Sequence, residues 1–500
     1  MRKTMITMML LLGTGATAAP RTPQSPAART AATLDRIADS PPRLRIFLNA
    51  MPKGGDLHNH NGGSIYAEDF LRWAAAGGLC IATDTWRVVD PPCDKPGRIP
   101  AAGLEKDYAS YSRAIDAFST RGFESGVGDP MVSGYNRFFA TFDAFGVASR
   151  GNNAASFALT RDQAAADHVA YVELGSGSHQ VRKVVEALGT TDSLDFDQLY
   201  AKIAPAIPTA VAAARKDYDG YEADALSLAT CATPEKPDCG VAMRYLPTAI
   251  RTVAPQQVFA QLAFNFALVE ADPRFVGVNI AAPEHDPIAV RDYALHMRMI
   301  AWLKARHPTV KLSLHAGELT LGLVPPRDLA FHIREAVEVA GAKRIGHGID
   351  ISYEKDAPAL LKRMARDRID VEINLTSNAV ILGVKGKAHP LSLYREYGVP
   401  VTLSTDDEGV SRSDMTNEYV RAVTEQGLRY LDLKAMVRDS LQYSFLPGAS
   451  LWADRSGGAR ASACSAMESP ACATFLAASP KAAKQAQLER DFATFEAAPH

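Results

Sequence analysis

The 500-residue sequence lacks several features that would assign it at once to a class of protein. It contains no stretch of the about 20 apolar residues that a membrane-spanning helix requires. It also has no excess of one charge, because 54 basic side chains balance 56 acidic ones and the net charge is -2. Nucleic acids and anionic membranes attract clustered Lys and Arg. We therefore expect no nucleic-acid partner, no membrane partner, and a small molecule as the ligand.

Cysteine is scarce, and none of the six residues lies in the closely spaced pair typical of a zinc–thiolate site. The cysteines instead form three pairs of near neighbours, separated by loops rich in Pro, Asp or Ser. Short loops favour pairing between neighbours, and an oxidising compartment lets disulfides persist. Free buried thiols are the alternative. We expect the disulfides Cys80–Cys93, Cys231–Cys239 and Cys464–Cys472.

The first 18 residues have the pattern of a secretory signal peptide. Arg2 and Lys3 form a basic start, residues 5–12 an apolar run too short to cross a bilayer, and residues 16–18 a small-residue cleavage site. A plain amino-terminal helix is the alternative. We expect removal of residues 1–18 on export, and a mature protein that is periplasmic or secreted.

Short apolar runs alternate with longer helical patterns along the chain. Residues 287–306 and 326–340 have the apolar spacing, or the Pro start and Gly stop, of helices. The predicted strands are 54–59, 169–175, 242–248, 275–281, 310–315, 343–347, 369–375 and 399–405.

Eight strand–helix units predict an α/β fold, a (β/α)8 TIM barrel with helical insertions after strands one and two. A doubly wound open sheet is the competing architecture, but the first strand ends in histidines and no glycine-rich phosphate turn follows it. We expect residues 79–100 to form a disulfide-closed loop over the barrel mouth. The predicted divisions are a signal peptide (1–18), a helical lead-in (19–50), the barrel (51–450) with insertions at 61–168 and 176–241 that cap its mouth, and a carboxyl-terminal extension (451–500).

Polar residues gather at the ends of the predicted strands, where a barrel of this kind carries its active site. His58 and His60 are two apart in one strand, so both side chains point to the same side. Any one of these residues has an ordinary structural explanation, but their coincidence at strand ends favours a metal site. The other members of the set are His315 and Glu318 after strand five, His347 after strand six, and Asp406 and Asp407 after strand eight.

Three histidines and a carboxylate with no thiol suit Zn²⁺, although Fe²⁺ or Co²⁺ would accept the same ligands. Such an ion lowers the pKa of a bound water toward neutrality. A centre with two metals usually needs a bridging lysine from strand four, and residues 275–284 contain no lysine. We therefore expect one Zn²⁺ per chain.

Several short motifs then resemble one known family, the adenosine deaminases of the metal-dependent amidohydrolase superfamily. The resemblance extends from about residue 45 to 450, and the export signal and disulfides favour the secreted, growth-factor-like branch. The motifs are MPKGGDLHNH at 51–60, LHAGE at 314–318, RIGHG at 344–348, LTSN at 375–378, LSTDD at 403–407 and QYSFL at 442–446.

The resemblance implies a role for each matching residue. Glu318 would give a proton to N1 of a purine, and His347 would take a proton from the attacking water or orient that water. Asp407, with Ala282 and His60, would contact the substrate, Asp407 at purine N7. The implied metal ligands are His58, His60, His315 and Asp406.

Two positions depart from the family pattern. Gly62 stands where many adenosine deaminases have an aspartate that binds the 5′-hydroxyl of the sugar, so the ribose would be held differently. Ala282 stands where the family has a glycine whose N–H faces purine N3, and its methyl group and Pro283 restrict the backbone. The His-x-Glu and Pro-Cys-x-x-Cys motifs of other zinc deaminases are absent.

The expected activity is zinc-dependent hydrolytic deamination of adenosine or 2′-deoxyadenosine, giving inosine or 2′-deoxyinosine and ammonia. Deamination of another aminopurine, such as adenine or a 5′-modified adenosine, is the nearest alternative. A protein that binds nucleosides without turnover is a third, which the presence of Glu318, His347 and Asp407 disfavours. A homodimer is left open.

Overall fold

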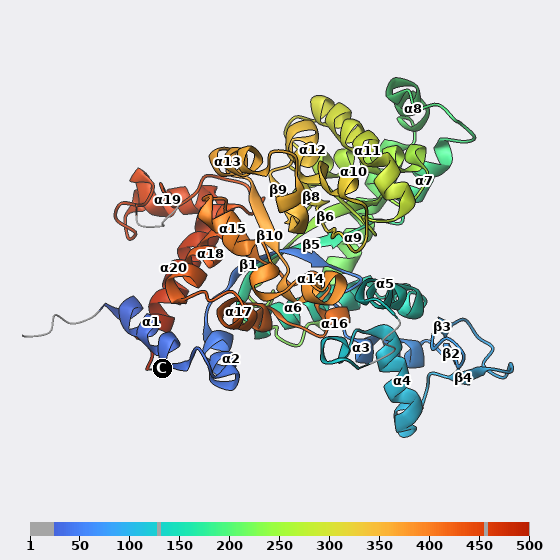
Figure 1. Ribbon diagram of the computed structural model, residues 1–500, viewed down its shortest axis with the longest axis horizontal. Coiled ribbons are helices and arrows are strands. Elements are labelled where there is room, and N and C mark those ends of the chain that lie inside the picture. The colour runs from blue at the N-terminus through green and yellow to red at the C-terminus, as the bar shows by residue number, and fades with distance from the viewer. Residues whose placement is uncertain (1–24, 128–131, 455–458, 500) are drawn as a thin grey trace, which may run out of the picture.

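Eight parallel strands form the centre of the molecule in the computed structural model, which describes residues 25–127, 132–454 and 459–499 (Figure 1). They form two four-stranded sheets, ordered β1-β5-β6-β7 and β11-β10-β9-β8. The strands are β1 (Gly54–His60), β5 (Val169–Ser176), β6 (Ala242–Ile250), β7 (Asn279–Ala281), β8 (Ser313–Ala316), β9 (Arg344–His347), β10 (Asp370–Ile373) and β11 (Val401–Leu403).

Single parallel bridges join the two sheets at both seams. Asn59 pairs with Asp406 between β1 and β11, and Val278 pairs with Leu312 between β7 and β8. The eight strands therefore close into a ring, and the predicted (β/α)8 barrel is confirmed, with every predicted strand in its place. The strand β7 is shorter than predicted because residues before Asn279 pair only through the isolated bridges at Phe275 and Val278.

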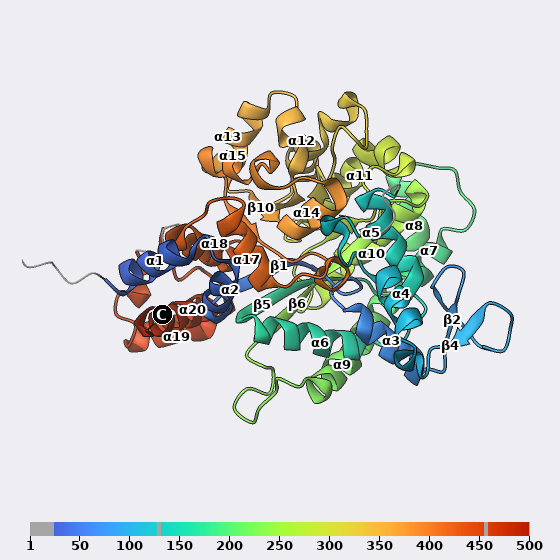
Figure 2. The same ribbon diagram turned by 60° about the horizontal axis from the view of Figure 1, so that its bottom comes forward.

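Helices surround the ring on its outer side (Figure 2). The predicted helix at 287–306 is confirmed as α11, and Asp286 caps it by accepting a hydrogen bond from Ile288 N at 2.8 Å. The outer helices are α6 (Asn153–Ala166), α9 (Ile207–Leu228), α10 (Pro255–Ala271), α11 (Pro287–Arg306), α13 (Ala357–Asp367), α15 (Leu391–Glu396), α17 (Met415–Thr424) and α18 (Tyr430–Gln442).

The predicted single helix at 326–340 is wrong in detail. A 3₁₀ turn (Pro326–Leu329), the short α12 (His332–Glu335) and a π-helical turn (Ala336–Ala340) replace it. Tertiary contacts explain the break, because His332 is held by the Glu284 carboxylate at 2.6 Å and its carbonyl accepts from the Tyr293 hydroxyl at 2.8 Å. The apolar spacing in the sequence carries no information about these tertiary contacts, so it predicts one unbroken helix.

The connection from β1 to β5 contains a small subdomain with its own apolar cluster. Phe70 and Phe145 stack at its centre, with ring centroids 4.0 Å apart. Its elements before α6 are α3 (Ala67–Ala76), β2 (Cys80–Ala82), β3 (Val88–Val89), β4 (Arg98–Pro100), α4 (Tyr108–Phe118) and α5 (Gly134–Phe145). The connection from β5 to β6 adds α7 (Val181–Ala187) and α8 (Phe196–Ile203) before α9.

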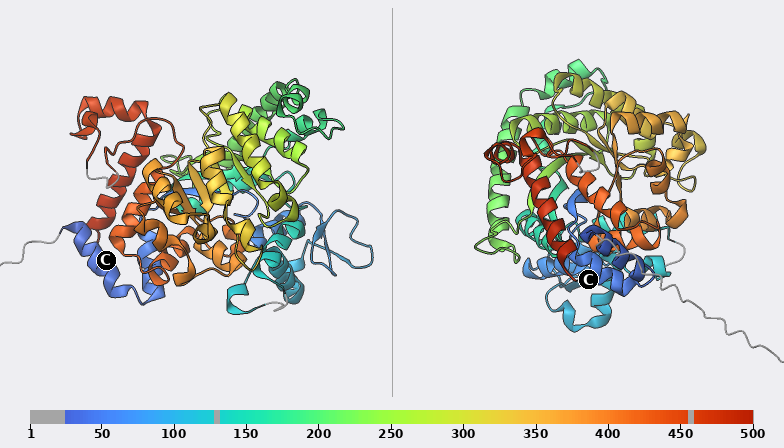
Figure 3. Two further views of the ribbon diagram at one scale, coloured as in Figure 1. Left: turned by 45° about the horizontal axis from the view of Figure 1, so that its top comes forward. Right: turned by 90° about the vertical axis from the view of Figure 1, so that its left-hand side faces the viewer.

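The expectation that residues 79–100 cover the barrel mouth is wrong. The three-stranded sheet β3-β2-β4 projects away from the barrel beside α3 and α4 (Figure 3), and none of its residues lines the central cavity. Ile81 and Val88 are buried in the apolar cluster of the subdomain, which draws the sheet to that side. Helix α5 reaches the cavity instead.

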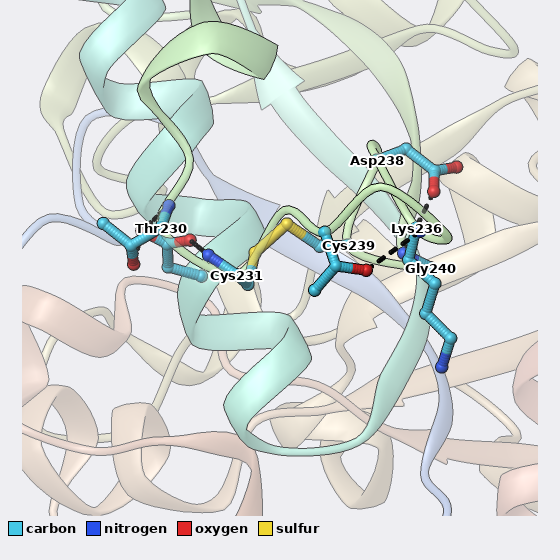
Figure 4. The surroundings of a disulfide bond; sticks show 8 residues. Thr230, Cys231, Lys236, Asp238, Cys239 and Gly240 are labelled. Atoms are coloured by element: carbon cyan, nitrogen blue, oxygen red, sulfur yellow. Dashed lines mark hydrogen bonds between the residues drawn. A yellow bond between two sulfur atoms is a disulfide. The ribbon is translucent and has the colours of Figure 1, made fainter.

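The three predicted disulfides are present, with Cα atoms 5.4, 5.3 and 4.5 Å apart in chain order. Cys231–Cys239 closes the loop between α9 and β6, and hydrogen bonds within that loop, such as Gly240 N to Asp238 Oδ1 at 3.0 Å, order it further (Figure 4). Cys464–Cys472 ties the start of the carboxyl-terminal extension to α19 (Pro470–Ala478).

The two ends of the described chain lie close together on one side of the barrel (Figures 1 and 3). Helix α1 (Pro26–Ile37) packs against α18 and α20 (Pro480–Ala497), and α2 (Pro41–Ala50) packs against α17. The predicted signal peptide at 1–18 lies outside the described residues. Among the helices that the structure describes, none combines the length and apolar character needed to cross a membrane.

A buried ion network crosses the interior of the barrel. The Arg344 guanidinium on β9 donates to Glu173 on β5 and to Glu372 on β10, both at 2.5 Å, and all three side chains are buried. The guanidinium also lies over the Phe445 ring, 3.8 Å from its centroid. Because the positive charge compensates two buried carboxylates, the network depends on Arg344.

Replacing Arg344 with methionine therefore leaves two buried carboxylates without their cation. We expect Arg344→Met to lower the free energy of unfolding by about 3–5 kcal/mol. Urea unfolding followed by circular dichroism measures the change. Arg327→Met is the matched control, because the Arg327 side chain is 81% exposed and its ion pair is worth little. Equal unfolding midpoints for the two variants would contradict the proposed dependence.

Candidate active site

Four side chains converge at the carboxyl ends of the barrel strands. His58 and His60 come from β1, His315 from β8, and Asp406 follows β11. The Nε2 atom of His60 lies 3.2 Å from Nε2 of His58, 3.2 Å from Nε2 of His315 and 3.2 Å from Oδ1 of Asp406. The His58 Nε2 to Asp406 Oδ1 distance is 3.4 Å.

These separations fit a single tetrahedral zinc ion. Zinc–nitrogen bonds of about 2.0–2.1 Å place the donor atoms of a tetrahedron about 3.3 Å from one another. Without a cation between them, the lone pairs of two imidazoles and a carboxylate would face the His60 ring and repel one another. His60 thus lies within reach of each of the other three predicted ligands, and His58, His315 and Asp406 also group with His347 as side chains that could hold a metal ion.

The backbone is unusual at two of the site residues. Asp406 has φ 57° and His347 has φ 70°, in the left-handed region that L side chains rarely adopt. Such conformations cost about 1–3 kcal/mol and persist where surrounding structure enforces them, as at active sites. Here the seam with β1 holds Asp406, whose N–H donates to His58 O at 2.8 Å.

Outer partners orient the histidine rings. Nδ1 of His58 donates to Glu372 at 2.7 Å, and Nδ1 of His315 donates to Asn279 Oδ1 at 3.0 Å, so each ring directs Nε2 to the centre. Burial opposes ionisation of Glu372, but Arg344 and His58 outweigh it and lower its pKa to about 2. Neither Glu372 nor Asn279 is predicted from the sequence. Each is a polar residue within an apolar strand, and that pattern could have pointed to it.

Glu318 and His347 lie beside the donor set. Nε2 of His347 is 3.8 Å from Glu318 Oε1 and 3.8 Å from Asp406 Oδ2. Burial, reinforced by the negative charge of Asp406, raises the pKa of Glu318 to about 8, so its carboxyl group holds a proton at neutral pH. Burial lowers the pKa of His347 to about 3, which keeps the ring neutral. Burial and Asp406 likewise raise the pKa of Asp407.

Glu284, which the sequence analysis also missed, holds the loop that carries Glu318. Its carboxylate accepts from Gly317 N at 3.0 Å, from Glu318 N at 2.9 Å and from His332 Nδ1 at 2.6 Å. Burial would raise the pKa of Glu284, but Arg251, 3.7 Å away, and His332 outweigh it and lower the pKa to about 2. Glu284 therefore fixes the backbone of Glu318 and adds a negative charge nearby.

The site opens into a cavity of about 650 Å³. The cavity is lined by His60, His315, Glu318, His347, Asp406 and Asp407 together with Gly62 and Ala282, so every predicted site residue except His58 faces it, and His58 lies behind. Three phenylalanines of α5 form an aromatic wall: Phe138, Phe139 and Phe142.

Among the residues that the structure describes, neither Lys nor Arg lines this cavity. Its outer polar side chains already have partners in the protein. Ser176 Oγ lies 2.7 Å from the Tyr218 hydroxyl, Thr248 Oγ1 donates to a carbonyl at 2.9 Å, and the Gln261 amide bonds both backbone groups of Ile250. The cavity therefore suits an uncharged molecule with a flat ring at the metal end.

Ala282 adopts φ 85°, a value that glycine reaches without strain. The departure from the family glycine therefore costs backbone strain here, and the Arg251 Nε–H, which donates to Ala282 O at 2.7 Å, helps to hold it. At the second departure, a Cβ atom on Gly62 would meet only the Phe142 ring, at 4.0 Å.

A barrel with three histidines and an aspartate at its carboxyl face defines the class of metal-dependent barrel hydrolases. Comparison with known proteins then gives the family. The sequence model described as adenosine deaminase matches residues 131–451. The chain belongs to the adenosine deaminase family.

Among curated relatives, an adenine deaminase of Rhizobium rhizogenes is 31% identical over 216 residues, which cover 43% of this chain and 61% of the relative. The first three such relatives are matched over 59–65% of their own length. The match therefore spans only part of each of these relatives.

Two solved structures have the same fold. A Burkholderia ambifaria amidohydrolase with bound Zn has a TM-score of 0.52 at 19% identity, covering 91% of this chain and 95% of that one. The Arabidopsis protein ADAL complexed with IMP has a TM-score of 0.51 at 19% identity, covering 80% and 93%.

The outer partners predict a graded effect on metal affinity. Because Asn279 orients His315, we expect Asn279→Ala to weaken zinc binding by about 10–100-fold without abolishing it. Competition against a chromophoric chelator measures the affinity. Thr248→Ala, which alters the cavity wall but touches no ligand, is the control. Zinc affinity equal to that of the unaltered protein would contradict the proposed role of Asn279.

Proposed function

We propose that the protein catalyses zinc-dependent hydrolytic deamination of adenosine or 2′-deoxyadenosine to the inosine form and ammonia. The observation that carries the proposal is the Glu318 carboxyl group, which faces the same cavity as His60, His315 and Asp406 and whose pKa is raised by burial. A bound zinc ion would supply an activated water at neutral pH. His58, His60, His315 and Asp406 would hold that ion.

The remaining residues supply the proton transfers and the contacts with the ring. Glu318, protonated at neutral pH, gives its proton to N1 of the purine, which makes C6 a better electrophile. Asp407, whose pKa is raised by burial and by Asp406, would hydrogen-bond N7. Ala282 lines the cavity, and its N–H would face N3.

A nucleoside fits the cavity better than a nucleotide. A phosphate group is normally bound by Arg, Lys or a helix N-terminus, and no Lys or Arg in the described part of the chain lines the cavity. IMP bound to the Arabidopsis protein is thus no guide to the substrate of this chain. Adenine is the second candidate, favoured by the adenine deaminase relatives and by outer polar side chains that already have partners.

We further propose that the protein is exported and works in the periplasm or outside the cell. The signal-peptide pattern at 1–18 and three disulfides support this location, because disulfides persist in oxidising compartments. Edman sequencing of the protein purified from a periplasmic extract would identify the cleavage site, and an intact Met1 in that fraction would contradict it.

A substrate panel tests the activity. We expect the zinc-loaded protein to release ammonia from adenosine and 2′-deoxyadenosine with kcat/KM at least about 100-fold above that for AMP. The reason is that the phosphate group of AMP would lie in the cavity without a cationic partner. Ultraviolet absorbance and ammonia release measure the rates, and adenine is included as the second candidate. Chelation should abolish the activity and zinc should restore it. A preference for AMP would overturn the proposal.

The proton on Glu318 predicts the alkaline limit of activity. Burial and Asp406 raise its folded-state pKa to about 8, so the acid form prevails below that pH and is lost as pH rises through it. We expect kcat/KM for adenosine to fall about tenfold per pH unit above about pH 8. Glu318→Gln, which cannot release a proton, should lose about 10²–10⁴-fold in activity. A profile that stays flat to pH 10 would remove Glu318 as the acid.

A further inference from the structure

Three buried side chains form a hydrogen-bonded chain behind the cavity. His389 lies before α15, Asn378 lies in α14 (Leu375–Leu382), and His347 ends β9. Nε2 of His389 is 3.1 Å from Asn378 Oδ1, and Asn378 Nδ2 is 3.0 Å from His347 Nδ1. Their exposed fractions are 1%, 0% and 1%, so water does not compete for these bonds.

A backbone N–H group fixes which atoms donate and which accept along these hydrogen bonds. The Leu391 N–H lies 3.1 Å from Nδ1 of His389, and a backbone N–H can only donate, so this Nδ1 carries a lone pair. Burial and the charge of Arg421 lower the pKa of His389 to about 3, so the ring is neutral and its one hydrogen is on Nε2. His389 therefore donates to Asn378.

Asn378 passes this direction to His347. Because its Oδ1 accepts from His389, its Nδ2 amide group is the one that faces His347, and an amide nitrogen only donates. A second amide nitrogen, Asn374 Nδ2, lies 3.4 Å from the same Nδ1 atom. Nδ1 of His347 is consequently the acceptor, and the single hydrogen of the neutral ring sits on Nε2.

On this basis we propose that His347 faces the cavity as a hydrogen-bond donor rather than as a base, with Asn378 and His389 as positioning residues. Its Nε2 atom faces the carboxyl groups of Glu318 and Asp406, each with an oxygen 3.8 Å away. This inference rests on the proposed function for its kinetic consequences, whereas the tautomer itself follows from the hydrogen bonds.

The proton balance of deamination then runs through Glu318. His347 orients the attacking water by donating to its oxygen and takes no proton. The proton of Glu318 goes to N1, one water hydrogen replaces it on Glu318, and the other leaves on the departing ammonia. The water oxygen first bonds to C6 as N1 takes its proton, and the C6–nitrogen bond then breaks as the amino group takes the remaining water hydrogen and leaves as ammonia, so atoms and charges balance.

Nitrogen NMR reads the tautomer directly. In zinc-loaded protein with ¹⁵N-labelled histidine, long-range ¹H–¹⁵N correlation spectra distinguish an Nε2–H ring from an Nδ1–H ring, and His347→Gln identifies the resonances. We expect Nε2–H for both His347 and His389. An Nδ1–H pattern for His347 would overturn the proposal. This measurement needs no substrate, so it decides the tautomer even if no purine is deaminated.

Variants of Asn378 test the kinetic role. Asn378→Asp puts an acceptor opposite Nδ1, which draws the hydrogen to Nδ1 and leaves Nε2 without one. We expect kcat for adenosine to fall about 10²-fold, as for the loss of one positioned donor, with KM and zinc content little changed. Asn265→Asp, another buried asparagine that lies in α10 outside the cavity, is the control. An unchanged kcat in Asn378→Asp would overturn the donor role.

Variants of His389 separate positioning from packing. His389→Gln keeps an amide N–H for Asn378 Oδ1 and should retain kcat within about threefold, whereas His389→Leu keeps the volume but loses the donor and should lower kcat about tenfold. Equal kcat values in the two variants would show that His389 only fills space, and would overturn its assignment as a positioning residue.

Discussion

The seam between β1 and β11 is the constraint on which the site depends. His58 O accepts from Asp406 N at 2.8 Å, and His60 N donates to Asp406 O at 3.1 Å, so two backbone bonds close the barrel at this edge. The same residues provide three of the four donor side chains. Closure of the fold and assembly of the metal centre are therefore one event, and strain at Asp406 is tolerated because the seam enforces it.

Electrostatics divides the buried carboxylates into two groups. Glu372 and Glu284 lie behind the cavity, where Arg344 or Arg251 and a histidine lower their pKa values to about 2. Glu318 faces the cavity, where burial and the charge of Asp406 outweigh the charge of Arg251 and raise its pKa to about 8. Glu372 and Glu284, which are ionised, fix the geometry of the site, whereas Glu318 holds a proton that it can donate. Position relative to the arginines separates the roles of chemically equivalent groups.

The strand ends and ligand types could be predicted because they depend on local patterns: two-residue alternation at His58 and His60, and polar tips on apolar strands. Glu284, Asn279 and His389 could not, because their roles come from contacts 33 or more residues away or from ring orientations that no local pattern records. For the same reason the 79–100 loop was misplaced, since burial of Ile81 and Val88 draws it to the subdomain and away from the mouth.

The aromatic wall of α5 explains how an insertion selects the ligand while the barrel supplies the chemistry. Phe138, Phe139 and Phe142 add apolar surface opposite the metal centre and bring no charge with them. A flat heterocycle loses little on leaving water for such a wall, whereas a phosphate would lose its hydration with no cation to replace it. If the proposed function holds, selection for an uncharged purine would follow from the composition of this cavity wall, independently of the residues that move protons.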